Sequence, residues 1–229
     1  MGMPSQTRSS LDKDLGMLYY ASSTEGIGGI LREKLDDFRV YEIAVGNVLC
    51  EPGCSKYLRG QGDYVWLLLE KRGIDTVTAI RAVARALKVS HKKFSAAGLK
   101  DSRAVTFQLI CAEGVDPGAI PRFIGEKIII HDVFTMPFKL APGMLEGNLF
   151  EIIIRKLNYN SEKAEQVISK ILCEISDFRG IPNYYGYQRF GTIRPITHIV
   201  GKLIIQDNFE EAVREILVKI FPSESEKAR

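Results

Sequence analysis

The sequence predicts an α+β fold. Strand-like segments are numerous, helical segments lie between them, and several strands could pair as antiparallel neighbours, which favours α+β over a doubly wound parallel fold. No G-x-G-x-x-G or Walker A pattern follows a strand, so we expect no nucleotide cofactor. The 229 residues are 45% hydrophobic and 26% charged, which suits a globular protein with a buried core.

The clearest strand is predicted at 37–45, where DFRVYEIAV alternates and puts Phe38, Val40 and Glu42 on one face. A turn-rich loop, CEPGCSKYLRGQGD, leads from this region into the next apolar run. Apolar runs predict four further strands, at 64–70, 104–112, 127–135 and 148–157.

Three helices are predicted between and after these strands. Asp75 is placed to cap the first helix, whose apolar stripe is formed by Val77, Ile80, Ala84 and Leu87. Arg81 and Arg85 fall off this stripe, so we expect them to face outward. A second amphipathic helix is predicted at 160–176, and a third begins at Asn208 with a capping arrangement.

The sequence shows no segment typical of a membrane span or of a secretory signal. No segment reaches the roughly 20 apolar residues that span a bilayer. The N-terminal MGMPSQTRSS lacks the apolar region of a secretory signal. We therefore expect a cytoplasmic protein that makes no membrane contact.

The four cysteines do not predict a metal site. Cys50 and Cys54 form CEPGC, but no second pair and no histidine follows at a zinc-site spacing. Cys111 and Cys173 lie in apolar runs, and we expect both to be small core residues.

The distribution of charge says more than the net charge of +3. The segment from Arg81 to Arg103 is strongly basic and holds a single acid, Asp101, while 178–206 holds basic and aromatic residues and no acid. Basic segments interleaved with aromatics are typical of a surface that binds a polyanion and stacks bases. A solvated helix face is the alternative for the first segment.

The stretch GLKDSR, at 98–103, is the first candidate site. Asp101 lies between Lys100 and Arg103, and flanking cations favour the ionised carboxylate that a nucleophile requires. Gly98 would let the backbone pass close to a ligand. The alternative is a turn in which Asp101 accepts hydrogen bonds from nearby backbone amides. No histidine lies nearby, so a serine-type triad is not indicated.

The second candidate stretch is LEGNLFEIIIR, at 145–155. Gly147 and Asn148 could make a tight turn into a strand, and the Asn148 amide both donates and accepts hydrogen bonds. Phe150 would then lie on one face of the strand. The local alternative is a hairpin turn followed by a core phenylalanine.

The third candidate stretch is GIPNYYGYQRFG, at 180–191, which packs three tyrosines, a phenylalanine, an arginine and three glycines into twelve residues. Tyrosines stack on bases, and Arg189 could pair with a phosphate or a base edge. The alternative is an aromatic cluster that anchors a long loop on the core.

Taken together, GLKDSRAVTFQ, GNLF and NYYGYQRFG resemble, in order and separation, the three signature stretches of the TruD family of tRNA pseudouridine synthases. DDFRVYEI resembles the family's N-terminal DF-x-V-x-E strand, and the likeness spans about 26–191. Four ordered motifs are far more specific than any one of them. The resemblance implies a mixed, largely antiparallel sheet flanked by helices.

The resemblance also implies roles for individual residues. Asp101 matches the catalytic nucleophile, and Arg32 falls where the family has a basic residue that pairs with it, with Lys34 as a competitor for that place. Phe150 matches an aromatic that stacks near the target uracil, and Asn148 helps to shape the pocket. The implied substrate-binding residues are Phe150, Asn148, Lys100, Asn183, Gln188, Arg189 and Phe190.

The reaction implied by the resemblance converts a uridine of tRNA to pseudouridine, by family precedent at position 13 in the D arm. The N1–C1′ bond breaks and C5 rejoins C1′ after the base has left the stack. Asp101 would act covalently or by way of a glycal-like intermediate, and both routes stay open. The reaction needs no metal, redox agent or nucleotide. The implied partner is tRNA, and we favour a monomer.

One departure from the family concerns length. The family's catalytic domain is interrupted by an inserted domain, and this sequence stops soon after the third motif. We therefore expect an N-terminal half with an incomplete sheet: an extension at 1–25, part of the catalytic domain at 26–200 and the start of the inserted domain at 201–229. The alternative function is an RNA-binding fragment that is folded but catalytically incomplete.

Overall fold

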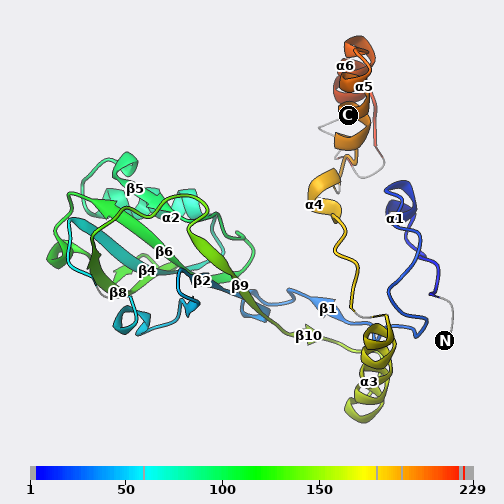
Figure 1. The fold of residues 1–229 in the computed structure, drawn as a ribbon, viewed down its shortest axis with the longest axis horizontal. Coiled ribbons are helices and arrows are strands. Elements are labelled where there is room, and N and C mark those ends of the chain that lie inside the picture. The colour runs from blue at the N-terminus through cyan, green and yellow to red at the C-terminus, as the bar shows by residue number, and fades with distance from the viewer. Residues whose placement is uncertain (1–3, 59, 179, 192, 222–223, 225–229) are drawn as a thin grey trace. The chain divides into compact units, whose positions relative to one another are not determined.

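The structure is a computed structural model that describes residues 4–58, 60–178, 180–191, 193–221 and 224 (Figure 1). Contacts divide the chain into two compact units. The sheet unit is Gly28–Asn158, and the helical unit combines Met1–Ile27 with Tyr159–Arg229. Each unit is described by itself, and the division predicted above at 1–25, 26–200 and 201–229 stays a prediction.

The sheet unit contains an eight-stranded sheet with the order β3-β2-β6-β4-β8-β7, in which β5 also pairs with β6 and β9 with β2. Only the β2–β6 pair is parallel, and the other pairs are antiparallel. The α+β class with a mixed, largely antiparallel sheet is therefore confirmed. The strands are β2 (Phe38–Ala44), β3 (Val48–Leu49), β4 (Tyr64–Arg72), β5 (Phe94–Ala96), β6 (Val105–Glu113), β7 (Phe123–Ile124), β8 (Ile128–Met136) and β9 (Leu145–Ile152).

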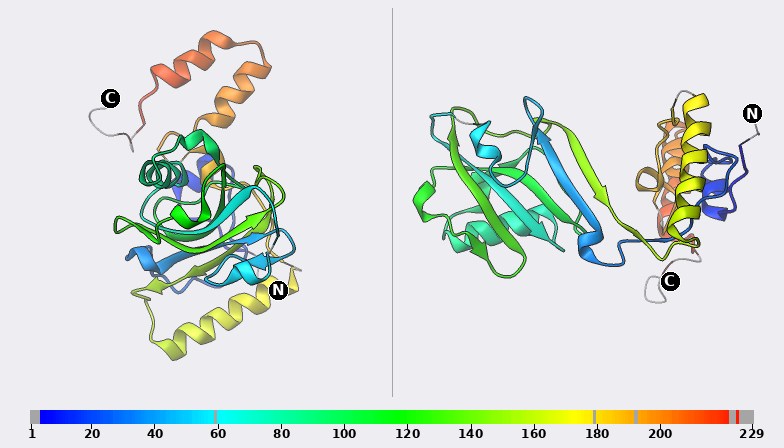
Figure 2. Two further views of the ribbon diagram at one scale, coloured as in Figure 1. Left: turned by 90° about the vertical axis from the view of Figure 1, so that its left-hand side faces the viewer. Right: turned by 90° about the horizontal axis from the view of Figure 1, so that it is seen from below.

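The core of the sheet unit lies on both faces of β4 and β6, which explains why these strands read as continuous apolar runs. On one face, helix α2 (Thr76–Ala86) packs against the sheet (Figure 2), and its Ala79 and Val83 belong to the same buried cluster as Leu67. On the other face, Trp66 is fully buried, and its ring N–H donates to the Phe138 carbonyl at 3.1 Å. Each large apolar side chain buried in this way contributes about 1.5–3 kcal/mol.

Helix α2 begins as predicted, and Ile80, Ala84 and Leu87 of its predicted stripe pack in or against the buried cluster. Asp75 accepts a hydrogen bond from the Thr78 amide at 2.9 Å, and Arg81 and Arg85 are exposed, as expected. Val77, however, is 41% exposed, and Thr76 is buried in its place, so its position on the apolar stripe was wrong. The reason is polar: the Thr76 hydroxyl donates to the Gln108 side chain at 2.8 Å inside the sheet unit.

The predicted strand at 148–157 is two strands. β9 ends at Ile152, and β10 (Ile154–Arg155) pairs with β1 (Ile30–Leu31) in a separate two-stranded antiparallel ribbon (Figure 1). At the break, the backbone oxygen of Asp37 accepts from the Ile153 amide at 2.8 Å. Its buried carboxylate accepts from Arg155 at 2.7 to 2.9 Å, and this hydrogen bonding lowers the Asp37 pKa.

The helical unit contains the helices α1 (Ser10–Asp14), α3 (Ser161–Asp177), α4 (Tyr187–Phe190), α5 (Thr197–Ile205) and α6 (Phe209–Leu217). Asn160 and Asn208 cap α3 and α6 with their side chains, as their sequence positions predicted. Glu174 joins α3 to the N-terminal segment, since its carboxylate accepts from the backbone amides of Ser23 and Thr24 at 2.6 and 3.2 Å. Short 3-10 turns of the sheet unit lie at Leu35–Asp37, Cys54–Lys56, His91–Lys93 and Pro117–Ala119.

Three of the cysteines are core residues and one is not. Cys50, Cys54 and Cys111 are buried, and hydrogen bonding with the Cys54 side chain together with burial raises the pKa of the Cys50 thiol. Cys173 lies on an exposed face of α3, so its predicted core position was wrong. Within the described residues, no group of three or more His, Cys, Asp or Glu is arranged to hold a metal ion. None of the described helices is long and apolar enough to cross a membrane.

Candidate active site

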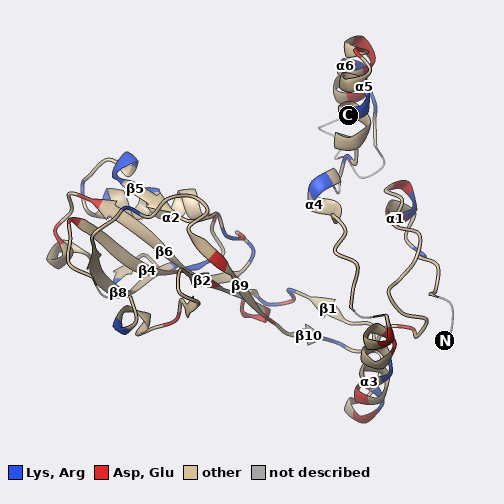
Figure 3. Cartoon of the chain, in the orientation of Figure 1, with Lys and Arg blue, Asp and Glu red and all other residues tan. Residues whose placement is uncertain are grey.

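Asp101 and Arg32 meet because β2 and β6 are parallel. Parallel neighbours begin at the same edge of a sheet, and each of these residues lies a few positions before its strand. The Arg32 Nη2 atom lies 3.2 Å from Asp101 Oδ2. The two side chains are 31% and 41% exposed, so the pair lies at the surface and is open to a ligand. Figure 3 shows lysine and arginine in both segments, between β1 and β2 and in the loop before β6.

The backbone and an aromatic ring orient Arg32. Its φ of +58° lies in the left-handed region, which a residue with a side chain rarely adopts and which recurs at functional sites. The guanidinium carbon lies 3.7 Å from the centroid of the Phe38 ring, a cation–π geometry. Phe38 thus holds the cation that faces Asp101, and Lys34, the competitor for that place, makes no ion pair with Asp101.

Phe150 and Asn148 lie on β9, next to this group. β9 pairs with β2 so that Phe150 is opposite Val40 and Asn148 is opposite Glu42. The Phe38 and Phe150 rings meet edge-on, with centroids 6.0 Å apart, so Asp101, Arg32, Phe38 and Phe150 form one continuous set of contacts. Phe150 is 53% exposed and available for stacking.

The local alternatives for these two stretches do not hold. β9 begins at Leu145, so Gly147 and Asn148 are inside the strand, and the predicted turn at this point was wrong. The pairing with β2 along the whole of β9 explains this, because it continues up to Leu145. Phe150 is not a core residue. Among the described residues, Arg32 is the only hydrogen-bond partner of the Asp101 carboxylate, so Asp101 does not cap a turn.

Buried polar side chains hold the backbone of the Asp101 loop from within. Lys71 Nζ donates to the carbonyls of Ile74, Lys100 and Asp101 at 2.8, 3.3 and 2.6 Å. Burial lowers the Lys71 pKa to about 8. Thr76 and Gln108 also support this loop. The Lys100 backbone N–H donates to the Thr76 hydroxyl at 3.0 Å, and the Gln108 side-chain amide donates to the Gly98 carbonyl at 3.2 Å.

Lys100 points into the sheet unit. Its Nζ lies 2.5 Å from Glu42 Oε2, and the two side chains are 4% and 1% exposed. Glu42 also accepts from the Leu109 amide at 3.2 Å. Burial raises the Glu42 pKa, while the charge of Lys100 opposes that shift. This placement is that of a residue that anchors the loop, and the predicted substrate contact of Lys100 stays a prediction.

The remaining predicted site residues belong to the helical unit. Asn183, Gln188 and Arg189 are exposed, and Arg189 lies 5.6 Å from the centroid of the Tyr185 ring. Phe190 packs edge-on against His198. Both Tyr185 and Phe190 line an open cavity of about 1020 Å³, together with aromatic and apolar residues of 15–21 and 178–184. Their roles stay predictions.

Sequence reasoning missed the supporting residues Lys71, Thr76, Gln108 and Phe38. A signal was present for two of them, since Lys71 and Gln108 are polar residues inside buried strands. A buried polar group must find a hydrogen-bond partner, so such a position indicates a long-range contact. The sequence does not indicate which partner.

Comparisons with known proteins agree on one family. The family model described as "tRNA pseudouridine synthase D (TruD)" matches residues 14–229. A probable tRNA pseudouridine synthase D of Methanosarcina barkeri is 37% identical over 96% of this chain and 48% of its own length. A protein of the same description from Pyrobaculum aerophilum is 38% identical over 96% of this chain and 51% of its own.

A solved structure shows the same fold. The crystal structure of a putative tRNA pseudouridine synthase D from Methanosarcina mazei matches with a TM-score of 0.80 and 36% identity, over 94% of this chain and 47% of that one. The chain thus spans about half the length of the relatives it matches.

Proposed function

Because the chain belongs to the tRNA pseudouridine synthase D (TruD) family, we propose that it carries the catalytic aspartate of an enzyme that isomerises a uridine of tRNA to pseudouridine. The observation that supports this most directly is the surface pair of Asp101 and Arg32 next to the exposed ring of Phe150. A carboxylate held by one cation, with an aromatic face nearby, suits attack on a base that has left its stack.

Each residue has a chemical role in this proposal. Extruding the uridine costs a few kcal/mol, and stacking of the uracil on Phe150 offsets part of that cost. The N1–C1′ bond breaks, C5 joins C1′, and the C5 proton is lost while N1 gains one, so the product is an isomer of the substrate. Arg32 orients the Asp101 carboxylate through the 3.2 Å contact between them. Asp101 attacks covalently or removes a sugar proton.

The finer parts of the proposal concern the substrate. By the resemblance, the target is position 13 in the D arm, and Asn183, Gln188, Arg189 and Phe190 contact the RNA. Their exposure and the ring of Tyr185 beside Arg189 support an RNA-binding role. A monomer in the cytoplasm is part of the same proposal.

A second candidate function is that of an RNA-binding fragment that does not catalyse the isomerisation. The observation that favours it is length, since the matched relatives are about twice as long as this chain. Their remaining half could supply groups that the reaction needs.

The deciding experiment is single-turnover pseudouridine formation on unmodified tRNA transcripts, with the product mapped by position. Wild type, Asp101→Asn and the control Asp63→Asn, an exposed aspartate of the same unit, are compared together with their tRNA affinities. Product from wild type and the control but not from Asp101→Asn, with equal affinities, supports the enzyme. Tight binding without product supports the fragment. Turnover by Asp101→Asn would contradict the role of Asp101.

A further inference from the structure

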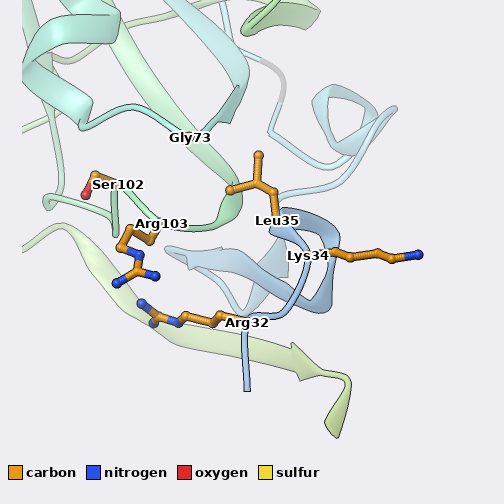
Figure 4. A pocket seen from close by; sticks show the side chains of 6 residues that line it. All are labelled: Arg32, Lys34, Leu35, Gly73, Ser102 and Arg103. Atoms are coloured by element: carbon orange, nitrogen blue, oxygen red, sulfur yellow. The ribbon is translucent and has the colours of Figure 1, made fainter. Parts of the chain in front are cut away.

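A small basic cavity adjoins the Asp101–Arg32 pair. It has a volume of about 220 Å³ and is lined by Arg32, Lys34, Leu35, Gly73, Ser102 and Arg103. Figure 4 shows that the guanidinium groups of Arg32 and Arg103 point toward one another across this space, from two segments far apart in the sequence. Three of the lining residues are cations and none is acidic.

The acids that could neutralise this cavity are engaged elsewhere. Asp36 pairs with Arg72 at 2.5 Å and with Arg39 at 3.3 Å. The two nearby acids Asp37 and Glu33 pair with other cations, Arg155 and Lys156. Within the part of the chain that the structure describes, neither Arg103 nor Lys34 makes an ion pair. Asp101, the neighbour of the lining residue Ser102, is paired with Arg32.

We propose that this cavity binds a phosphate group of the RNA backbone, the phosphodiester next to the nucleotide that Asp101 attacks; the inference rests on the proposed function. Two guanidinium groups that face each other repel unless an anion lies between them. Guanidinium groups bind phosphate oxygens through paired N–H donors, and Arg32 uses only its Nη2 atom on Asp101. Arg32 therefore has donors left for a phosphate that Arg103 would hold from the other side.

The position of the cavity favours RNA over a free anion. It lies directly beside Asp101, and a nucleotide whose base leaves the stack must be held by its backbone while the base moves. The isomerisation itself consumes no phosphate. A site for one phosphate at this point therefore positions the substrate, and Arg103 is a binding residue for it.

The test measures tRNA affinity as a function of salt. The 229-residue chain and its Arg103→Gln variant are titrated with an unmodified tRNA transcript between about 50 and 200 mM KCl. The loss of one phosphate contact should weaken binding roughly tenfold and reduce the slope of log affinity against log salt by about one. Arg103→Lys should keep most of the slope, because it keeps the charge, and lose part of the affinity.

The matched control is Arg122→Gln. Arg122 is an exposed arginine beside Phe123 on β7, an edge strand that β6, β4 and β8 separate from β2, and its loss removes the same charge. It should leave affinity and slope near wild type. Thermal unfolding midpoints of all variants test for a loss of stability, and Arg103→Gln, a change at an exposed residue, should keep the midpoint of wild type.

A second readout identifies the phosphate. Ethylation of single RNA phosphates should reveal a position whose modification blocks binding to wild type and is tolerated by Arg103→Gln. An unchanged affinity and slope in Arg103→Gln, or an identical ethylation pattern, would overturn the proposal. So would competition by inorganic phosphate that depends on Arg103 while the tRNA slope does not, since the cavity would then be a general anion site.

These outcomes are separate from those of the proposed function. An Arg103-dependent salt slope in a chain that forms no pseudouridine would refute only the isomerase. Pseudouridine formation with an Arg103-independent slope would refute only the phosphate site.

Discussion

The Lys71 ammonium group lies 2.6 Å from the backbone oxygen of Asp101, so a fully buried lysine of β4 holds the loop that carries the proposed nucleophile. The same group donates to the carbonyl of Lys100 in this loop and to that of Ile74 in the segment between β4 and α2, so it joins the two segments. A charged donor at the base of the loop leaves the Asp101 carboxylate free to face outward to Arg32.

Lys71→Met should slow single-turnover pseudouridine formation by about 100-fold while tRNA affinity changes little, because a small misplacement of a catalytic group has an effect of that size. It should also lower the free energy of unfolding by about 1–3 kcal/mol, since three carbonyls lose their donor. The exposed Lys127→Met is the control. A normal rate in Lys71→Met would show that Lys71 does not position Asp101.

Lys71 should also contribute a distinct pH dependence to stability. Burial lowers its pKa from 10.5 to about 8, so between these values the unfolded chain binds more protons than the folded one. The contribution of Lys71 to the free energy of unfolding therefore rises with pH across that window. Urea unfolding of wild type and Lys71→Met at several pH values from 8 to 10.5 measures it. The free energy of unfolding of wild type minus that of Lys71→Met should increase with pH. If the two free energies change in parallel with pH, the lowered pKa of Lys71 is contradicted.

The buried pair of Glu42 and Lys100 should behave as a unit. Lys100→Met leaves an uncompensated carboxylate in the core and should cost about 3–5 kcal/mol of unfolding free energy. Adding Glu42→Gln removes that charge and keeps an acceptor for the Leu109 amide, so the double variant should recover much of the loss. A double-mutant cycle by urea unfolding measures the coupling. Additive losses would mean that the two side chains do not interact.

The single-turnover rate should depend on the planar guanidinium group of Arg32 as well as on its charge. Arg32→Lys keeps a cation but loses the flat group that lies on the Phe38 ring, and Arg32→Met loses both. We expect the single-turnover rate to fall about tenfold in the first variant and about 100-fold or more in the second. Arg81→Met, on the exposed face of α2, is the matched control. Equal rates in Arg32→Met and wild type would remove Arg32 from the mechanism.

Phe150 should matter for turnover and little for stability, because it is already 53% exposed in the folded chain. Phe150→Ala removes a stacking face worth about 1–3 kcal/mol per base, which corresponds to a rate loss of roughly 10- to 100-fold. Phe150→Tyr keeps the ring and should stay near wild type. Phe123→Ala, a similarly exposed phenylalanine of β7, serves for comparison. If Phe150→Ala unfolds the protein and Phe123→Ala does not, Phe150 is a structural residue.

Sequence patterns predicted the helices and strands well where neighbouring residues decide the structure. The alternation of β2 matches its buried and half-buried positions, and Asp75, Asn160 and Asn208 cap the helices that follow them. Local patterns failed where a distant partner decides the outcome. Val77 is exposed because Thr76 turns inward to reach Gln108.

The candidate site likewise has some features that the sequence predicted and others that distant contacts decided. The motif around Asp101 was visible as a carboxylate among cations, and the spacing of motifs indicated the family. Whether Arg32 or Lys34 would face Asp101 was open, because both lie before the same strand. The left-handed backbone at Arg32 and the ring of Phe38 decide it.

The sequence alone predicted the α+β class and the order of the motifs, since these depend on residue types and short spacings, and the resemblance of the motifs to the TruD family pointed to Asp101 as the candidate nucleophile. Only the tertiary structure decided that Arg32 holds the Asp101 carboxylate, that Lys71 holds its backbone and that Lys100 points inward to Glu42. The physical reason is the parallel pairing of β2 with β6, which joins residues 39–41 to 105–107. A contact over that separation leaves no periodicity in the chain, but it places the start of both strands at one edge and so builds the site.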